Sequence, residues 1–436
     1  MATSKLTKIP EARRPAIVAG LRTPFLKMGT AFKHLSPLDL ATGVVTELVH
    51  RANLDTGEID RVVYGQVVPT IEIPSIAREL ILASGLPRTI DAFSVSRACA
   101  TSTQALVEAA QAIMLGEVDV VIVGGADATS RPPITISDGM VDALVAANAA
   151  KDPMSKAKAF LGLKPKDFLP KPPALTEPST GLTMGQSGEK MAKENGISRA
   201  DQDKFALRSH QKAADAWDNG IYDQEVMRYA VPPKYLEVVT RDGLVRPDTT
   251  LDKLSGLETV FDRKYGTVTA ASSSPLTDGA SALVVMSASK AKALGYEPLA
   301  YVKSWGFAAL DPSWQLLMGP SFATPLALDR AGMKLADLDL IDIHEAFAAQ
   351  VLSNLQAFAS KDWAKKHLNR SEAIGEVDED KLNIYGGSIS LGHPFAATGA
   401  RQALTMAREL DRRGGGTALC TQCAAGGLGA AVILER

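Results

Sequence analysis

The sequence predicts an α/β fold made of two similar halves, with a loop domain inserted into the first. Apolar, strand-like runs recur along the chain and alternate with stretches of helical periodicity, a pattern typical of layered α/β domains. These runs are 16–19, 62–64, 118–123, 338–343, 417–421 and 430–434. At 436 residues the chain exceeds the roughly 250–300 residues at which one core stops growing, so we expect two domains.

The two ends of the chain resemble each other. Each contains a strand, a special turn, an alanine-rich helix and a second strand, over 93–125 in the first copy and 383–429 in the second. The apolar side chains of each helix share one face. They are Ala105, Leu106, Ala109, Ala110 and Ile113 in one helix, and Ala400, Ala403, Leu404, Ala407 and Leu410 in the other. We place an N-terminal domain over 1–297 and a C-terminal domain over 298–436.

The segment 129–267 interrupts the alternation and predicts the inserted loop domain. It is rich in proline and lysine around 164–173 and becomes helical over 187–218. The amphipathic stretch 201–217 argues against a disordered linker. Inserted loops of this kind commonly build ligand contacts.

Composition excludes several function classes. With 47 basic and 49 acidic residues the formal net charge is -2, so no global field attracts nucleic acid. Three cysteines cannot form a disulfide framework, and an odd count is typical of a reducing compartment. No run approaches the roughly 20 apolar residues of a spanning helix. We therefore expect a cytoplasmic protein that is soluble or at most peripheral to a membrane.

Cys99 is the first candidate for chemistry, because it stands where the predicted alanine-rich helix opens. The helix dipole favours a thiolate there, so we expect a lowered pKa, and the free amide of Cys99 could bind an oxyanion. Taken alone, a buried and inert cysteine is the commoner outcome.

His393 and His344 are the strongest candidates among the six histidines. His393 lies between glycine and proline, which predicts a sharp, exposed turn. His344 and its neighbour Glu345 follow a strand, where active-site groups of α/β folds collect. The other four histidines have no supporting context and are expected at the surface or in packing.

Cys420 and Cys423 have the spacing of a redox or zinc pair. A structural zinc needs about four ligands, and no second pair lies nearby in the sequence. A thioredoxin-like pair opens a helix, whereas this pair ends a strand. We expect no metal, with Cys420 in the core and Cys423 beside a glycine-rich stretch whose amides can approach a ligand.

Taken together, these motifs resemble those of the thiolase family over nearly the whole chain. Segments 22–25, 96–105, 184–189, 197–203, 266–270, 344–347, 392–394 and 420–429 occur in the family's order. The resemblance implies a duplicated, five-layered α-β-α-β-α architecture that carries the inserted loop domain.

Three positions narrow the subfamily. His344 stands where most thiolases carry asparagine, and Ala396 and Ala425 stand where they carry glycine. A histidine there, with a long loop domain, resembles the β subunit of fatty-acid-oxidation trifunctional enzymes. The resemblance implies a 3-ketoacyl-CoA thiolase, an acyltransferase of β-oxidation. It would cleave 3-ketoacyl-CoA with CoA into acetyl-CoA and a shortened acyl-CoA.

The resemblance also implies residue roles. Cys99 is the acylated nucleophile, His393 its base, and Cys423 the acid/base for the acetyl-CoA enolate and incoming CoA, as retro-Claisen cleavage requires. The amides of Cys99 and Ala425 form one oxyanion hole. His393, with a water held by His344, forms the other, and Glu345 completes the catalytic set.

Coenzyme A enters as a substrate, and no cofactor is expected. The resemblance places Ser274 against the pantetheine arm and Arg246 near a phosphate, although Pro275 replaces the family's usual glycine. Met184 and Phe347 are candidates to line the acyl pocket, and both are equally compatible with a core position.

Three alternatives stay open. A condensing 3-ketoacyl synthase shares a Cys-His-His set, but it loses carbon dioxide and needs no second thiol such as Cys423. A biosynthetic, acetoacetyl-CoA-forming thiolase shares the mechanism and differs in direction and chain length. A scaffold or lipid-carrier subunit is disfavoured by the complete Cys-His-Cys set.

The resemblance implies partners as well. We expect a homodimer of the core halves and an α2β2 heterotetramer with an α subunit that has hydratase and 3-hydroxyacyl-CoA dehydrogenase activities. In 140–163, lysines among alanine and leucine are typical of a solvated helix or a partner contact. We prefer both interpretations to a weak peripheral membrane contact.

Overall fold

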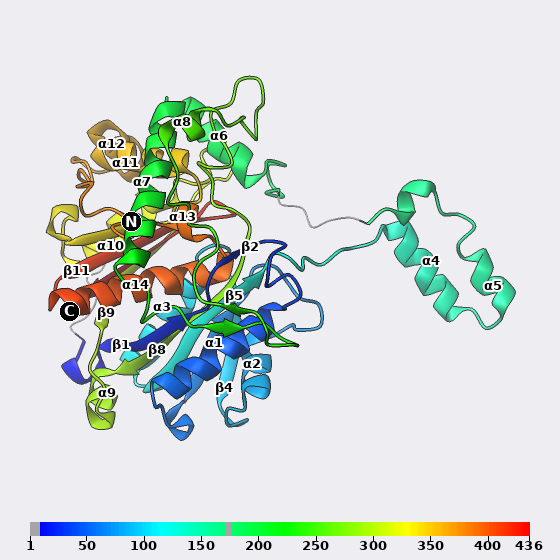
Figure 1. The fold of residues 1–436 in the computed structure, drawn as a ribbon, viewed down its shortest axis with the longest axis horizontal. Helices are drawn as coiled ribbons and strands as arrows, with labels where there is room; N and C mark the ends of the chain where they lie inside the picture. Colours follow the sequence, from blue (N-terminus) through cyan, green and yellow to red (C-terminus); the bar gives the residue numbers. More distant parts are fainter. Residues whose placement is uncertain (1–8, 171–175) are drawn as a thin grey trace.

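The computed structural model describes residues 9–170 and 176–436. Its centre is a continuous ten-stranded sheet, viewed in Figure 1. The strand order is β10 (Leu340–Ile343), β11 (Thr417–Ala424), β12 (Leu428–Glu435), β9 (Ala300–Ala309), β1 (Pro15–Arg22), β8 (Thr277–Ser287), β5 (Val120–Ala128), β3 (Arg61–Gly65) and β4 (Asp91–Val95), with β2 (Leu26–Lys27) paired to β8. All six strand-like runs of the sequence lie in or overlap these strands, which confirms them.

The sheet has a narrow seam between its N-terminal and C-terminal parts. Strands β1 and β9 meet only where Ala16 faces Tyr301 and Ile17 faces Ala300. By contrast, β1 pairs with β8 along nearly its full length. The seam lets the two parts turn their inner faces toward each other.

Two central helices fill the space between these inner faces. They are α3 (Thr101–Leu115) and α14 (Thr398–Arg413), the two alanine-rich helices predicted from the pseudo-repeat. Their apolar faces share one buried cluster with Val121 of β5 and Cys420 of β11. Small alanine side chains allow this close packing between two sheet surfaces.

Outer helices cover the other face of each sheet part. Helices α1 (Pro37–Arg51) and α2 (Ile76–Ser84) pack on the N-terminal part, and α10 (Gly319–Ala331) and α11 (Ala348–Ala359) on the C-terminal part. Alternation along the strands confirms the arrangement, since Ile122 faces the outer cluster whereas Val121 faces the central one. The predicted five-layered α-β-α-β-α architecture is therefore confirmed.

Strand β8 was missed by the sequence analysis. Its first half is polar or small, including Asp278, Gly279 and Ser281, yet every residue of the strand is buried. Tertiary hydrogen bonds satisfy these groups: Ser281 Oγ donates to Ala397 O at 2.5 Å, and Ser130 N donates to Asp278 Oδ1 at 2.9 Å. A hydrophobicity pattern cannot reveal a strand whose polar groups find partners only in the folded chain.

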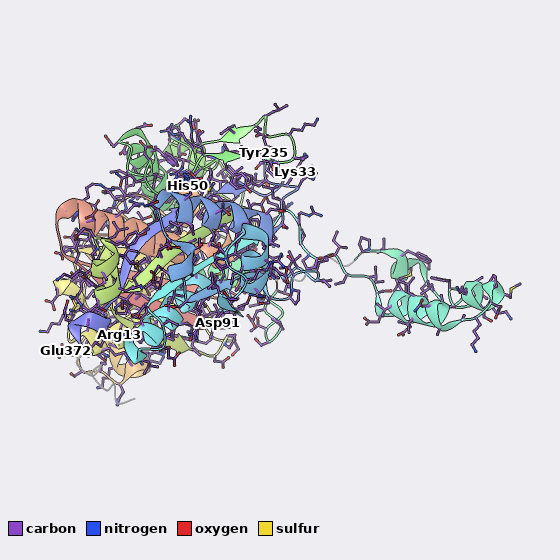
Figure 2. The ribbon with its side chains drawn as sticks, turned by 90° about the horizontal axis from the view of Figure 1, so that it is seen from below. Arg13, Lys33, His50, Asp91, Tyr235 and Glu372 are labelled. Carbon is purple, nitrogen blue, oxygen red and sulfur yellow. The ribbon has the colours of Figure 1, made fainter. Side chains whose placement is uncertain are left out.

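The inserted region forms two structures. Helices α6 (Met184–Glu194) and α7 (Arg199–Asp218) pack on the body, and α7 contains the predicted amphipathic stretch 201–217. Helices α4 (Asp138–Ala149) and α5 (Pro153–Lys158) instead form an arm, defined as 131–170, that projects away from the body (Figures 1 and 2). The continuous sheet crosses the boundary at 297–298, so the division into two domains with a loop domain over 129–267 stays a prediction.

No helix of the described chain has both the length and the apolar character required to cross a membrane.

A buried ion network ties β1 to the inserted region. Arg22 is fully buried and donates to Asp242 through both terminal nitrogens, at 2.7 and 2.9 Å, and to Glu225 at 3.1 Å. Thr405 of α14 donates to the same Glu225 carboxylate at 3.0 Å. The network thereby joins the first strand, the inserted region and a central helix.

We expect Arg22→Ala to lower the free energy of unfolding by about 3–5 kcal/mol, because two buried carboxylates lose their cation. Denaturant unfolding followed by circular dichroism measures the change. The matched control is Arg51→Ala, which breaks a partly exposed pair with Glu47 at 2.7 Å and should cost less than about 1 kcal/mol. Equal losses in the two variants would contradict a structural role for the buried network.

Candidate active site

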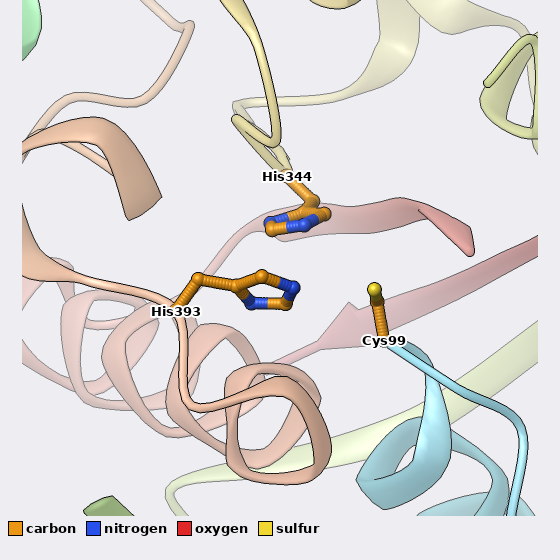
Figure 3. A group of neighbouring side chains, drawn as sticks. All are labelled: Cys99, His344 and His393. Atoms are coloured by element: carbon orange, nitrogen blue, oxygen red, sulfur yellow. The ribbon is translucent and has the colours of Figure 1, made fainter. Parts of the chain in front are cut away.

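Three side chains from distant parts of the chain converge at one point. Figure 3 shows the sulfur of Cys99 facing the rings of His344 and His393, and one ligand atom from each lies within 4.8 Å of the other two. The imidazole centroids are 4.2 Å apart. All three residues were predicted from the sequence as candidates for chemistry, and the fold brings them together.

Cys99 lies just before the N-terminus of α3. The helix begins at Thr101, so Cys99 precedes its first turn rather than opening it. The preceding Ala98 has φ 44°, a left-handed conformation that is strained for a residue with a side chain. Thr101 Oγ1 donates to Ala98 O at 2.7 Å and accepts from Arg97 N at 2.8 Å. These bonds hold the loop that presents the thiol.

The prediction of a lowered Cys99 pKa is wrong. Burial raises the pKa of the thiol to about 12, although the amides of Ala425 and of Cys99 itself favour the thiolate. Desolvation of the anion outweighs the helix N-terminus here. The thiol is therefore protonated at rest and needs a base. The two amides that favour the thiolate, those of Cys99 and Ala425, are the ones predicted to form an oxyanion hole.

His393 is positioned to be that base. The prediction that its turn is exposed is wrong, because the His393 side chain is only 3% exposed. Its Nδ1 lies 2.6 Å from Thr398 Oγ1, and its amide donates to Thr277 Oγ1 at 3.0 Å. Gly392 before it has φ 106°, and a Cβ there would meet Leu244 and Thr277.

Burial, with the charge of Arg401 as a second cause, lowers the pKa of His393 to about 3. The ring is therefore neutral at physiological pH. Its Nε2 has no hydrogen-bond partner among the described residues. A neutral imidazole with a free nitrogen beside a protonated thiol is arranged to accept a proton.

His344 has a matching environment at the end of β10. It is fully buried, and its Nδ1 lies 2.9 Å from Ser388 Oγ. Burial lowers its pKa well below the usual value, and the nearby His393 and Arg401 contribute in the same direction. Its Nε2 is also unpartnered within the described chain.

Glu345 contacts the loop that carries His393. Its carboxylate accepts from Asn383 Nδ2 and Ser209 Oγ, both at 2.7 Å, and from Ile389 N at 3.1 Å. Burial raises the pKa of this carboxyl. These are the contacts of a positioning residue, and the catalytic role given to Glu345 stays a prediction.

Cys423 lies near the end of β11 and is 1% exposed. Burial raises its pKa well above the usual value, and a thiolate at Cys99 would raise it further, so the two thiols influence each other. Cys420 packs in the central helix cluster, as predicted, whereas Cys423 belongs to an apolar cluster that contains Phe347.

A cavity of about 620 Å³ adjoins this centre. Arg246 and Ser274, the residues named for CoA, both line it. Its wall includes Leu276, which forms a β-bridge with His393. The cavity therefore runs from an exposed arginine to the backbone neighbour of His393, and its lining includes none of Cys99, His344, His393 and Cys423.

Met184 and Phe347 do not line this cavity. They lie in the apolar cluster of Cys423, where Phe347 is 7% exposed and packs edge-on against Phe261 at 5.9 Å. Their assignment to an acyl pocket stays a prediction.

Several residues that position the site were not predicted from the sequence. Thr398 and Ser388 orient the two imidazoles, and His210 on the cavity wall accepts from Arg246 N at 3.3 Å. Arg401 is 1% exposed and pairs with Asp342 at 2.8 Å behind the histidines. Ser388 and Thr398 each lie five residues from His393 and were close enough in sequence to be suspected, whereas His210 and Arg401 are more distant.

Comparison with known proteins agrees with this geometry. Residues 15–289 match the family model described as "Thiolase, N-terminal domain", and residues 296–436 match "Thiolase, C-terminal domain". The chain is 53% identical over 435 residues to a 3-ketoacyl-CoA thiolase of Pseudoalteromonas translucida, covering 100% of both chains.

Solved structures are similar as well. An acetyl-CoA acetyltransferase of Bacillus anthracis is 31% identical with a TM-score of 0.83, covering 97% of this chain and 98% of that one. A human mitochondrial 3-ketoacyl-CoA thiolase in complex with CoA is 29% identical with a TM-score of 0.82, covering 99% and 100%. The resemblance predicted from the motifs is confirmed, and the chain belongs to the thiolase family.

Proposed function

We propose that this protein is a 3-ketoacyl-CoA thiolase of fatty acid β-oxidation. One observation carries the proposal: a protonated thiol, Cys99, faces a neutral imidazole, His393, beside the cavity named for CoA. The full-length likeness to a protein named 3-ketoacyl-CoA thiolase supports the same substrate class.

In the first half-reaction, His393 Nε2 accepts the proton of Cys99 as the sulfur attacks the 3-keto carbon. The amides of Cys99 and Ala425 stabilise the resulting oxyanion. The bond between C2 and C3 then breaks, leaving an acyl group on Cys99. Cys423 protonates the departing acetyl-CoA enolate, whose thioester oxygen is stabilised by His393 and a water held by His344.

In the second half-reaction, the Cys423 thiolate accepts the proton of incoming CoA. The CoA sulfur attacks the acyl-Cys99 thioester, and the shortened acyl-CoA leaves. Cys99 regains the proton that His393 took, so both thiols end protonated. Two thiols with pKa values above neutrality suit this exchange, because a protonated thiol can donate and its thiolate can accept.

The CoA site has a physical basis in the cavity wall. Arg246 is exposed at the rim, where a guanidinium can pair with phosphate. Ser274 lines the same cavity and is half-buried, its amide donates to Ala346 O at 2.9 Å, and its hydroxyl would contact the pantetheine arm. Met184 and Phe347 would contact the acyl chain near Cys423.

A second candidate is a biosynthetic thiolase, favoured by the likeness to an acetyl-CoA acetyltransferase. Thiolysis rates for a series from acetoacetyl-CoA to 3-ketopalmitoyl-CoA separate the two. A preference for acetoacetyl-CoA alone would support the biosynthetic enzyme.

We further propose a homodimer that forms through β4. This strand ends the sheet order, and all five of its residues are exposed or half-buried, including Phe93 at 37%. Unpaired edge strands readily accept another chain. Sedimentation velocity of the protein and of Phe93→Asp, which should weaken pairing, tests the interface.

The arm is the proposed contact for an α subunit in an α2β2 assembly. Ala143 is the one buried residue among those of α4 and α5. Large apolar side chains are exposed instead, including Leu144 at 47%, Val145 at 64% and Leu161 at 81%. An exposed apolar patch of this kind is typical of an interaction site.

The three unpaired cysteines fit a cytoplasmic location.

Removing either site thiol should strongly impair thiolysis. We expect Cys423→Ser to lower kcat/KM by about 10²–10⁴-fold, the range for losing a proton-transfer group, and Cys99→Ser, which removes the nucleophile, to lower it at least as much. Cys420→Ala is the matched control, since this third thiol lies in the core and should leave kcat/KM unchanged. Thiolysis by Cys423→Ser at the wild-type rate would contradict the acid/base role proposed for Cys423.

The raised pKa predicts how Cys99 reacts with iodoacetamide. Because its pKa is about 12, the thiolate fraction at neutral pH is small and should grow about tenfold per pH unit up to that value. Alkylation of Cys99, followed by peptide mass spectrometry, should therefore rise continuously from pH 6 to pH 9. A plateau by neutral pH would show a resting thiolate–imidazolium pair instead.

Polar substitutions on the arm should weaken binding of an α subunit but not thiolysis. We expect Leu144→Ser combined with Val145→Ser to reduce co-purification with a co-expressed α subunit, because burial of both side chains is lost. The matched control, Leu115→Ser, changes a residue of the body that is 75% exposed. If the double variant instead loses salt-sensitive sedimentation with anionic liposomes, the arm contacts a membrane.

A further inference from the structure

Two buried nitrogen atoms at the centre have no protein partner. The Nε2 atoms of His344 and His393 make no hydrogen bond within the described residues, although both side chains are more than nine-tenths buried. Figure 3 shows both rings on the same side of the Cys99 sulfur. Unpartnered buried polar atoms are costly, so such a site is built to receive a ligand.

The far side of each ring is fixed. Ser388 Oγ lies 2.9 Å from Nδ1 of His344, and Thr398 Oγ1 lies 2.6 Å from Nδ1 of His393. When each Nδ1–H donates to its hydroxyl, each Nε2 presents a lone pair toward Cys99. Metal-binding histidines are likewise oriented by a hydrogen bond from the ring nitrogen that does not bind the metal.

We propose that Cys99, His344 and His393 also form a reversible binding site for one zinc ion. Occupation of the site prevents acylation of Cys99. The inhibition rests on the proposed function, whereas the binding rests on the geometry alone. The site would make a soft divalent cation a regulator of the enzyme.

The spacing of the three ligand atoms is close to what a tetrahedrally coordinated ion requires. Zinc bonds of about 2.3 Å to sulfur and about 2.0–2.1 Å to nitrogen place neighbouring ligand atoms about 3.4–3.6 Å apart. The three atoms lie within 4.8 Å of one another. The gap closes by rotation of the Cys99 side chain, and water completes the fourth position.

The donor set decides which ion binds. It offers one sulfur and two imidazole nitrogens, and the carboxylate of nearby Glu345 is occupied by Asn383, Ser209 and Ile389. Thiolate and imidazole select zinc or cobalt, whereas magnesium and calcium require oxygen ligands. The zinc–sulfur bond replaces the S–H bond of Cys99, one proton leaves to solvent, and no atom changes oxidation state.

Calorimetry of the full, chelator-treated protein without acyl-CoA tests the binding. We expect one Zn²⁺ per chain, with one proton released as measured in buffers of different ionisation enthalpy, and no binding of Mg²⁺. Co²⁺ should give the charge-transfer absorption of a cobalt–thiolate bond. Cys99→Ser should remove this absorption, and Ser388→Ala and Thr398→Ala should weaken binding about 10–100-fold.

The matched control is His50→Asn, which removes an exposed histidine on the body, labelled in Figure 2, and should leave binding unchanged. In the wild-type protein, Zn²⁺ should protect Cys99 from iodoacetamide, a readout that needs no variant to fold. Unchanged Zn²⁺ affinity in Cys99→Ser, or the absence of protection, would overturn the proposal. Because these measurements contain no substrate, their outcome does not depend on whether the protein catalyses thiolysis.

Discussion

The close approach of α3 and α14 at their N-terminal ends is the constraint on which the rest of the structure depends. Ser102 Oγ accepts from Ala400 N at 2.8 Å, and a Cβ on Gly399 would lie 2.2 Å from Thr103 Oγ1. Cys99 precedes one helix and His393 the other. Contact between the two helix starts therefore brings the proposed nucleophile to its proposed base across about 300 residues of chain.

Burial then determines the protonation states. Desolvation raises the pKa of both site thiols and lowers that of both histidines, so the centre contains no charged group at rest. Charge develops only as the proton moves, and the amides of Cys99 and Ala425 are already directed at the sulfur. A neutral, preorganised centre of this kind places its electrostatic stabilisation in the transition state rather than the resting state.

A layer of buried polar contacts holds this neutral centre. Glu345 fixes the loop before His393, and the hydroxyls of Ser388 and Thr398 fix the rings. Arg401, held by its ion pair with Asp342, supplies a buried positive charge that helps to keep both imidazoles neutral. Within the described chain the Nε2 atoms of His344 and His393 have no partner, and these two atoms connect the proposed catalytic arrangement to the proposed zinc site.

The sequence alone determined the strand-like runs, the two alanine-rich helices, the thiolase resemblance and the identity of Cys99, His344, His393 and Cys423. These follow from local periodicity and from motifs that are contiguous in the chain. Only the tertiary structure decided that β8 is a strand, that His393 is buried and that the Cys99 pKa is raised. Each of these depends on desolvation and on partners that are distant in sequence, which no local pattern contains.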